Sequence, residues 1–168
     1  EVDHLRRGLG LWKLAFLDAA PAVAIDTSDP LVARGQYLAE GPGHCGECHT
    51  PRNIFQAMSS GKSLAGGEIG NWQAYNISSD PKHGIGAWPQ EALVSYLSKG
   101  YAPGYGGAGG PMADAVEHSL RFLSPADLNA IAVYLKSTPA RSQGVPRPML
   151  TVNNQVEKGL GSKVFSES

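Results

Sequence analysis

Cysteine is scarce in this chain, which has only Cys45 and Cys48 among its 168 residues. Two cysteines so close together cannot cross-link distant parts of a fold, so a disulfide-stapled domain is excluded. An excess of one charge is also lacking, because the formal net charge is −1 and the isoelectric point is about 6.6. No basic surface therefore favours binding to nucleic acid.

Long hydrophobic runs are absent as well. A membrane-spanning helix needs about eighteen or more consecutive apolar residues, whereas the longest apolar stretch, residues 9–17, is interrupted by Lys13. The chain starts at Glu1 with no apolar signal core, so we expect any targeting segment to have been removed already. Alternation of apolar and polar residues, the pattern of half-buried strands, is not seen either. We therefore expect an all-α fold with long ordered loops.

Helix signals mark several segments. Capping residues or prolines open them and glycine or proline follows them, which predicts helices over residues 30–40, 89–99 and 124–138. The last of these opens with Ser124-Pro125-Ala126-Asp127, a capping-box variant with Asp in place of Glu. A further helical segment, around residues 116–123, carries apolar residues at helical spacing. The first helix contains Gly35 in its middle, which is costly unless another element packs closely there.

The middle of the chain, residues 51–88, consists mostly of helix- and strand-breaking clusters. Glycine and proline are frequent in the whole chain, at 21 and 12 residues, and many of them fall in this region. A loop region of this length inside a compact domain is unusual unless a large ligand serves as its core.

Both cysteines lie in the stretch His-Cys-Gly-Glu-Cys-His-Thr, residues 44–50. A structural zinc site would need a second Cys/His pair, but no other cysteine exists and the remaining histidines are scattered. A dithiol redox site would sit at a strand-to-helix junction in a βαβ unit, which the sequence does not indicate. The third reading is a covalent haem c, because thiols at this spacing can add to two vinyl groups of one haem, with His49 as the proximal ligand. The motif and its context favour the haem.

A second axial ligand is available in Met112. It follows Pro111 and the glycine-rich loop 104–110. Glycines let the backbone approach a porphyrin face closely, and proline fixes the angle of approach. The commonest role of a methionine, however, is to fill space in the core.

Other side chains remain as alternatives for this position. His83 or His118 is a possible ligand, although we expect His118 on the surface of its helix. Met58 lies too close along the chain to the attachment site to cross easily to the opposite face. Met149 sits in a proline-spaced tail and could belong to core or surface.

Several motifs follow one another along the chain: Gly35-x-Tyr37, Cys45-x-x-Cys48-His49-Thr50-Pro51-Arg52-Asn53, Asn76-Ile77, Gly84-Ile85-Gly86-x-Trp88, Gly110-Pro111-Met112 and the run from Ser124 to Leu135. In this order they resemble class I cytochrome c domains. They are most similar to the multi-haem cytochrome subunits of bacterial membrane-bound dehydrogenases that oxidise alcohols, sugars, sugar acids or aldehydes. The resemblance covers roughly residues 9–139. One departure is Trp88-Pro89, where a Ser or Thr helix cap usually follows the tryptophan.

The resemblance implies a class I cytochrome c fold with short helices and long loops around one haem. It implies Cys45 and Cys48 as thioether anchors. It also implies that Gly35 and Tyr37 pack against the last helix near Tyr134. The residues that it implies at or around the haem are the axial ligands His49 and Met112, together with Tyr37, Trp72, Asn76, Trp88 and Pro111. The two tryptophans and the asparagine could lie near the propionates or equally form ordinary core.

Domains of this kind occur three to a polypeptide in that family. We therefore expect an N-terminal extension or linker from a preceding domain over residues 1–28 and a haem domain over 29–140. Residues 141–168 would then form a C-terminal linker and the start of a following domain. The chain would be one haem domain of a larger subunit.

A haem iron with both axial positions filled has no site for substrate, so the expected function is one-electron transfer and not catalysis. The resemblance implies that electrons come from a dehydrogenase catalytic subunit, pass through other haem domains, and continue towards quinone or a terminal oxidase. It implies a periplasmic location, with the membrane reached only through the parent subunit. The alternative is a five-coordinate haem domain that acts as a sensor or as a peroxidase.

Overall fold

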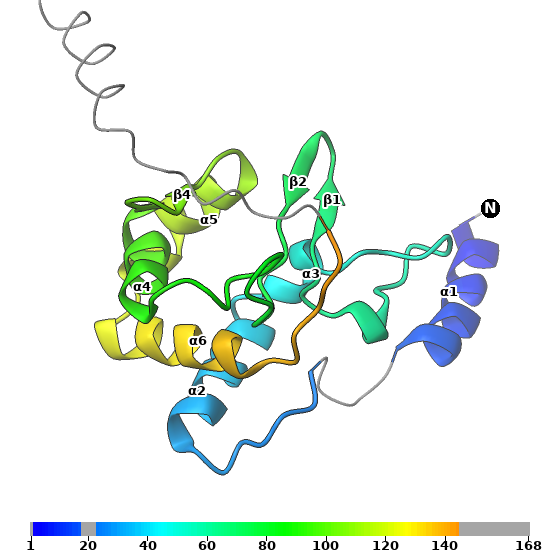
Figure 1. Cartoon of the computed structure of the whole chain (residues 1–168). Helices are drawn as coiled ribbons and strands as arrows, with labels where there is room; N and C mark the ends of the chain where they lie inside the picture. Colours follow the sequence, from blue (N-terminus) through cyan, green and yellow to red (C-terminus); the bar gives the residue numbers. More distant parts are fainter. Residues whose placement is uncertain (1, 18–22, 145–168) are drawn as a thin grey trace, which may run out of the picture.

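Helices dominate the computed structural model of the chain, which describes residues 2–17 and 23–144 (Figure 1). The α-helices there are α1 (Val2–Phe16), α2 (Pro30–Glu40), α3 (Cys45–His49), α4 (Gln90–Lys99), α5 (Pro111–His118) and α6 (Pro125–Ser137). Short 3-10 turns are η1 (Ser60–Lys62) and η2 (Leu120–Phe122), and the strands are β1 (Gly67–Ile69), β2 (Trp72–Ala74), β3 (Tyr101–Ala102) and β4 (Gly106–Gly107). No helix in these two ranges is long and apolar enough to cross a membrane.

The predicted helix ends are confirmed by their caps. The Asp29 carboxylate accepts a hydrogen bond from the Leu31 amide at 2.8 Å at the start of α2, and α4 ends at Gly100, whose φ of 73° is left-handed. The Ser124 hydroxyl accepts from the Asp127 amide at 3.1 Å and opens α6. The Asp127 carboxylate also pairs with Arg34 of α2 at 2.8 Å.

Helices α2 and α6 cross in close contact, in the lower part of Figure 1. A Cβ atom added at Gly35 would overlap the carbonyl oxygen of Ala130 and lie 2.6 Å from Cβ of Tyr134. The mid-helix glycine is therefore explained by the approach of the two backbones, as predicted. Tyr37 is a correction: two residues along a helix turn the side chain by about 200°, and Tyr37 is 62% exposed. Its ring contacts the guanidinium of Arg34, which is also on α2. Tyr37 therefore does not share the close contact that Gly35 makes with α6.

The hydrophobic core lies between α2, α4 and α6 and extends to the loop 85–88 and to α5. Leu93 and Leu97 of α4 are buried there, and so are Leu128, Ile131, Ala132 and Leu135 of α6. The predicted helical segment around residues 116–123 is interrupted at Ser119, so it forms α5 and the separate turn η2. Trp88 is buried and its ring packs against those of Tyr96 and Tyr105, at centroid distances of 5.8 and 4.9 Å.

Two small antiparallel sheets show that the expectation of an all-α fold holds only in part. Strands β1 and β2 form a hairpin with Ile69 opposite Trp72, and its turn contains Gly70 at a φ of 57°. Strands β3 and β4 pair in the same way. Strands of two or three residues, rich in glycine, are too short to show the alternation by which strands are recognised in a sequence. Residues 51–88 are otherwise mostly loop, as expected.

Segments on both sides of residues 29–140 contact that region. Trp12 of α1 donates a hydrogen bond to the carbonyl of Phe55 at 2.9 Å, and Val23 is buried in the core. After α6, the Asn76 side chain donates to the carbonyl oxygens of Arg141 and Gln143 at 2.6 and 3.0 Å. The expectations for Met149 and for a following domain lie outside the described residues.

The helix crossing predicts the effect of Gly35→Ala. The added methyl group forces α2 and α6 apart, because it meets backbone and not the end of a flexible side chain. Overpacking of this kind costs about 1–3 kcal/mol of unfolding free energy. Urea unfolding followed by circular dichroism measures this cost. Gly61→Ala is the control, since a Cβ atom there meets nothing within 4 Å. Equal stability of the two variants would contradict the close approach.

Candidate functional site

The cysteine motif forms the one-turn helix α3, directly after α2. His44 precedes it in the left-handed region at a φ of 48°, which turns the chain between the two helices. Cys45 is half-buried against the core, while Cys48 is exposed. Burial raises the pKa of the Cys45 thiol to about 11. Dithiol redox sites depend on a cysteine with a lowered pKa, so Cys45 does not have the character of such a site.

In the described part of the chain, the cysteine motif also has too few neighbouring ligands to hold a metal ion. Within residues 2–17 and 23–144, no group of three or more His, Cys, Asp or Glu side chains lies close enough together to hold a metal ion. A structural zinc ion needs four ligands. This part of the chain therefore offers no zinc site around Cys45 and Cys48.

His49 has a fixed orientation. Its Nδ1 lies 2.6 Å from the carbonyl oxygen of Tyr75. A backbone carbonyl can only accept a hydrogen bond, so Nδ1 carries the proton and the lone pair of the neutral ring is on Nε2. Ligating histidines generally donate their second ring nitrogen to a carbonyl or carboxylate in this manner. The imidazole is thus held in the tautomer that metal coordination through Nε2 requires.

Thr50 connects the motif to the loop that follows it. Its hydroxyl accepts a hydrogen bond from the buried Leu64 amide at 3.1 Å. Leu64 has a positive φ of 64°, a conformation that a residue other than glycine adopts only when its surroundings impose it. A second bond, from the Ile77 amide to the Leu64 carbonyl at 2.9 Å, holds the same residue from the other side.

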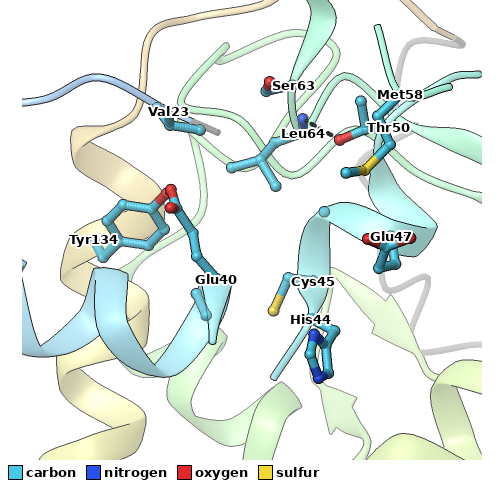
Figure 2. A pocket seen from close by; sticks show the side chains of 12 residues that line it. Val23, Glu40, His44, Cys45, Glu47, Thr50, Met58, Ser63, Leu64 and Tyr134 are labelled. Carbon is cyan, nitrogen blue, oxygen red and sulfur yellow. Dashed lines mark hydrogen bonds between the residues drawn. The ribbon is translucent and has the colours of Figure 1, made fainter. Parts of the chain in front are cut away.

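A pocket lies on the side of α3 that faces α2 and α6. Figure 2 shows the Glu40 carboxylate beside the Tyr134 hydroxyl at one end, Thr50 and Met58 at the other, and Leu64 between them. The Tyr134 hydroxyl donates to Glu40 at 2.5 Å. Burial, together with this bond, raises the pKa of Tyr134 far above its usual range, so the phenol stays protonated. Cys45 also lines this pocket.

Met112 is the second residue of α5, which lies to the left of the β1–β2 hairpin in Figure 1. Its side chain is half-buried and packs against the hydrophobic core. Pro111 occupies the first turn of the helix, as its fixed φ favours. Gly110, the N-cap, has a φ of 50°, which glycine adopts without strain.

The alternative ligands have other surroundings. The His83 ring lies 3.1 Å from the Asp80 carboxylate, whose pKa is lowered mainly by the His83 backbone amide. His118 is exposed in the last turn of α5, as expected. Met58 is 39% exposed and lines the pocket beside Cys45. Of the two methionines, Met112 packs against the hydrophobic core, whereas Met58 lies at the pocket.

The remaining predicted site residues have different surroundings. Asn76 is buried, and besides its bonds to the segment after α6 its carbonyl oxygen accepts from both the amide and the hydroxyl of Ser78. Trp88 belongs to the core. Trp72 is 53% exposed and lies against Gly110. Tyr37 lies on the outer side of α2.

Some participants were not found from the sequence. Tyr75 acts through its backbone carbonyl, which every residue has, so its side chain gives no signal. The interaction of Glu40 with Tyr134 joins residues 94 positions apart and likewise has no local signature. The Thr50 hydroxyl was predicted only as part of a motif and not as the partner of Leu64.

Comparison with known proteins identifies homologues. No family model matches the chain. The fructose dehydrogenase cytochrome subunit of Gluconobacter japonicus is 44% identical over 140 residues, which are 83% of this chain and 29% of that protein. The cytochrome c subunit of the quinone alcohol dehydrogenase of Gluconobacter oxydans is 43% identical, over 83% of this chain and 31% of its own length. The gluconate 2-dehydrogenase cytochrome c subunit of Pantoea cypripedii is 39% identical, over 93% and 37%.

The chain thus spans about a third of the length of these relatives. Identity at this level over most of the chain confirms the resemblance to cytochrome c subunits of dehydrogenases. The homology implies a covalently bound haem c, which the Cys-x-x-Cys-His motif at residues 45–49 suits.

The hydrogen bond between Thr50 and Leu64 predicts that two substitutions of Thr50 lower the stability by different amounts. Thr50→Val keeps the shape of the side chain but leaves the buried Leu64 amide without its acceptor, which costs about 1–3 kcal/mol of unfolding free energy. Thr50→Ser keeps the hydroxyl and loses only a methyl group, so it should be the milder change. Urea unfolding of both variants tests this order, and a valine variant as stable as the serine variant would contradict it.

Proposed function

We propose that this chain, a homologue of the cytochrome c subunits of dehydrogenases, is a haem domain with a class I cytochrome c fold that carries one electron at a time. Electrons would come from a partner dehydrogenase subunit and continue towards quinone or a terminal oxidase. The observation that carries the proposal is the His49 imidazole, held by the Tyr75 carbonyl at 2.6 Å and placed directly after two cysteines at haem-attachment spacing.

The residues present suit a haem c. The thiols of Cys45 and Cys48 would form the two thioether bonds, and His49 Nε2 and the Met112 thioether would be the axial ligands. A half-buried thioether and an imidazole with its proton fixed on Nδ1 are the donor set of a six-coordinate, low-spin site. When bound, the haem supplies a one-electron couple between ferric and ferrous iron.

The protein's contribution is to hold these ligands. The Tyr75 carbonyl orients the His49 ring and makes Nε2 a better donor. A thioether ligand from Met112, whose side chain is partly buried, would favour the ferrous form and raise the potential relative to a site with two histidines. With His49 and Met112 both bound, the haem would have no open position for a substrate, which supports a carrier and not an enzyme.

The names of the relatives support the proposed partner. Those names refer to dehydrogenases of fructose, alcohol and gluconate, so the electron donor is proposed to be a dehydrogenase subunit of this kind. Because the chain corresponds to about a third of such a subunit, residues 29–140 would be one haem domain of several, with residues 1–28 and 141–168 as its connections. A periplasmic location, with the membrane reached through the parent subunit, fits a covalently attached haem.

The variant Met112→Ala tests the axial ligand. The haem-loaded wild type should show a low-spin spectrum with the weak long-wavelength ferric band that a methionine ligand gives. Met112→Ala should lose that band, become high-spin and bind carbon monoxide when reduced. Met58→Ala is the matched control, since this methionine also lies close to the motif, and it should keep the wild-type spectrum.

Two results would overturn the proposal. A wild-type protein that is already high-spin and binds carbon monoxide would be a five-coordinate haem domain, either a sensor or a peroxidase. An unchanged spectrum in Met112→Ala would mean that another side chain is the ligand. Mass spectrometry of the wild type and of Cys45→Ser and Cys48→Ser separately tests the covalent attachment.

A further inference from the structure

The β1–β2 hairpin connects the two sides of the proposed haem site. At its base, the Gly66 amide donates to the His49 carbonyl at 2.8 Å. A Cβ atom on Gly67 would lie 2.6 Å from the Cys48 carbonyl oxygen, so the strand rests directly on α3. Tyr75, which accepts the His49 ring proton, is the next residue after β2. The base of the hairpin is therefore fixed to the cysteine motif.

The other end of the hairpin reaches the segment before Met112. Trp72 is the first residue of β2 and its indole lies against Gly109 and Gly110. A Cβ atom on Gly110 would overlap the indole, with Cζ2 only 2.7 Å away, whereas a Cβ on Gly109 would be 3.4 Å from Cζ3. Only glycine at residue 110 permits this contact.

The contacted backbone is the part that begins α5. The Gly110 carbonyl accepts from the Ala113 amide at 2.9 Å, and the Gly109 carbonyl accepts from the Met112 amide at 3.3 Å. A displacement of residues 109–110 therefore displaces Met112 with it. His49 has separate supports in α3 and Tyr75, so it would not follow.

We propose that Trp72 is a positioning residue that holds the Met112 segment at a fixed separation from His49, with the β1–β2 hairpin as the spacer. This inference rests on the proposed function, in which Met112 is an axial ligand. Trp72 is 53% exposed, so it fills little of the core, and its large flat ring covers glycine backbone that has no side chains of its own. A large aromatic residue at an exposed site of a three-residue strand is explained by this contact.

The first experiment measures how readily an added ligand replaces Met112. The haem-loaded ferric protein is titrated with imidazole, and the methionine band is recorded. Trp72→Ala should bind imidazole about three- to tenfold more tightly, the change expected from loss of one aromatic contact. Trp72→Phe should stay close to the wild type. Tyr101→Ala, which removes an exposed aromatic residue of the other hairpin, should have no effect.

The second experiment isolates the contact by a double-mutant cycle. Gly110→Ala should weaken methionine ligation in the wild-type background, by steric overlap with the indole and by strain at a positive φ. In the Trp72→Ala background only the strain remains, so the effect of Gly110→Ala should be smaller. Gly109→Ala should be mild in both backgrounds.

Each outcome decides one question. If the wild type has no methionine band, the proposed ligand is wrong, whatever Trp72 does. If the band is present but Trp72→Ala binds imidazole as the wild type does, or the cycle is additive, the positioning role is wrong and the proposed function stands. If the Trp72→Ala variant does not assemble with haem, the imidazole titration is carried out on the Trp72→Leu variant. An intermediate imidazole affinity then supports the role, and an affinity equal to that of the wild type overturns it.

Discussion

The close crossing of α2 and α6 at Gly35 is the contact on which the rest of the structure depends. Helix α2 leads into the cysteine motif after a turn of only four residues, so the position of α3 follows from the position of α2. Because a single Cβ atom at Gly35 would overlap α6 backbone, the two helices can approach this closely only with glycine at that position. The crossing is reinforced at its ends, by Arg34 with Asp127 and by Glu40 with Tyr134.

With α2 and α6 placed in this way, the cysteine motif is held by hydrogen bonds to backbone groups more than by contacts between side chains. His49 is oriented by the Tyr75 carbonyl, and Thr50 holds the amide of Leu64. A backbone carbonyl does not titrate, so the acceptor of this hydrogen bond is the same at every pH. A carbonyl also cannot donate, which fixes the tautomer. For an imidazole that, in the proposed function, keeps one geometry in two redox states, such partners are better suited than a carboxylate.

The sequence predicted those features that have local signals. The caps at Asp29, Gly100 and Ser124 marked the helices correctly, and Gly35 correctly indicated a close approach. The β1–β2 hairpin was missed because its strands are short and carry no alternating pattern. Tyr37 was misplaced because its motif was considered without the angular spacing of the helix. The bond between Tyr75 and His49 could not have been predicted, because it depends on where the chain returns in space.

The long loops are also ordered by hydrogen bonds between side chains and backbone groups. We expected residues 51–88 to need a large ligand as their core, yet several of their turns are closed by their own side chains. Asn53 accepts from the amides of Phe55 and Ala57, and Asp80 accepts from those of Lys82 and His83. Asn76 joins the loop to the segment after α6. Such side-chain bonds to backbone order a loop locally. The polypeptide therefore supplies part of the order that keeps the ligand residues in place, and a bound haem would add to a scaffold whose turns already satisfy their own polar groups.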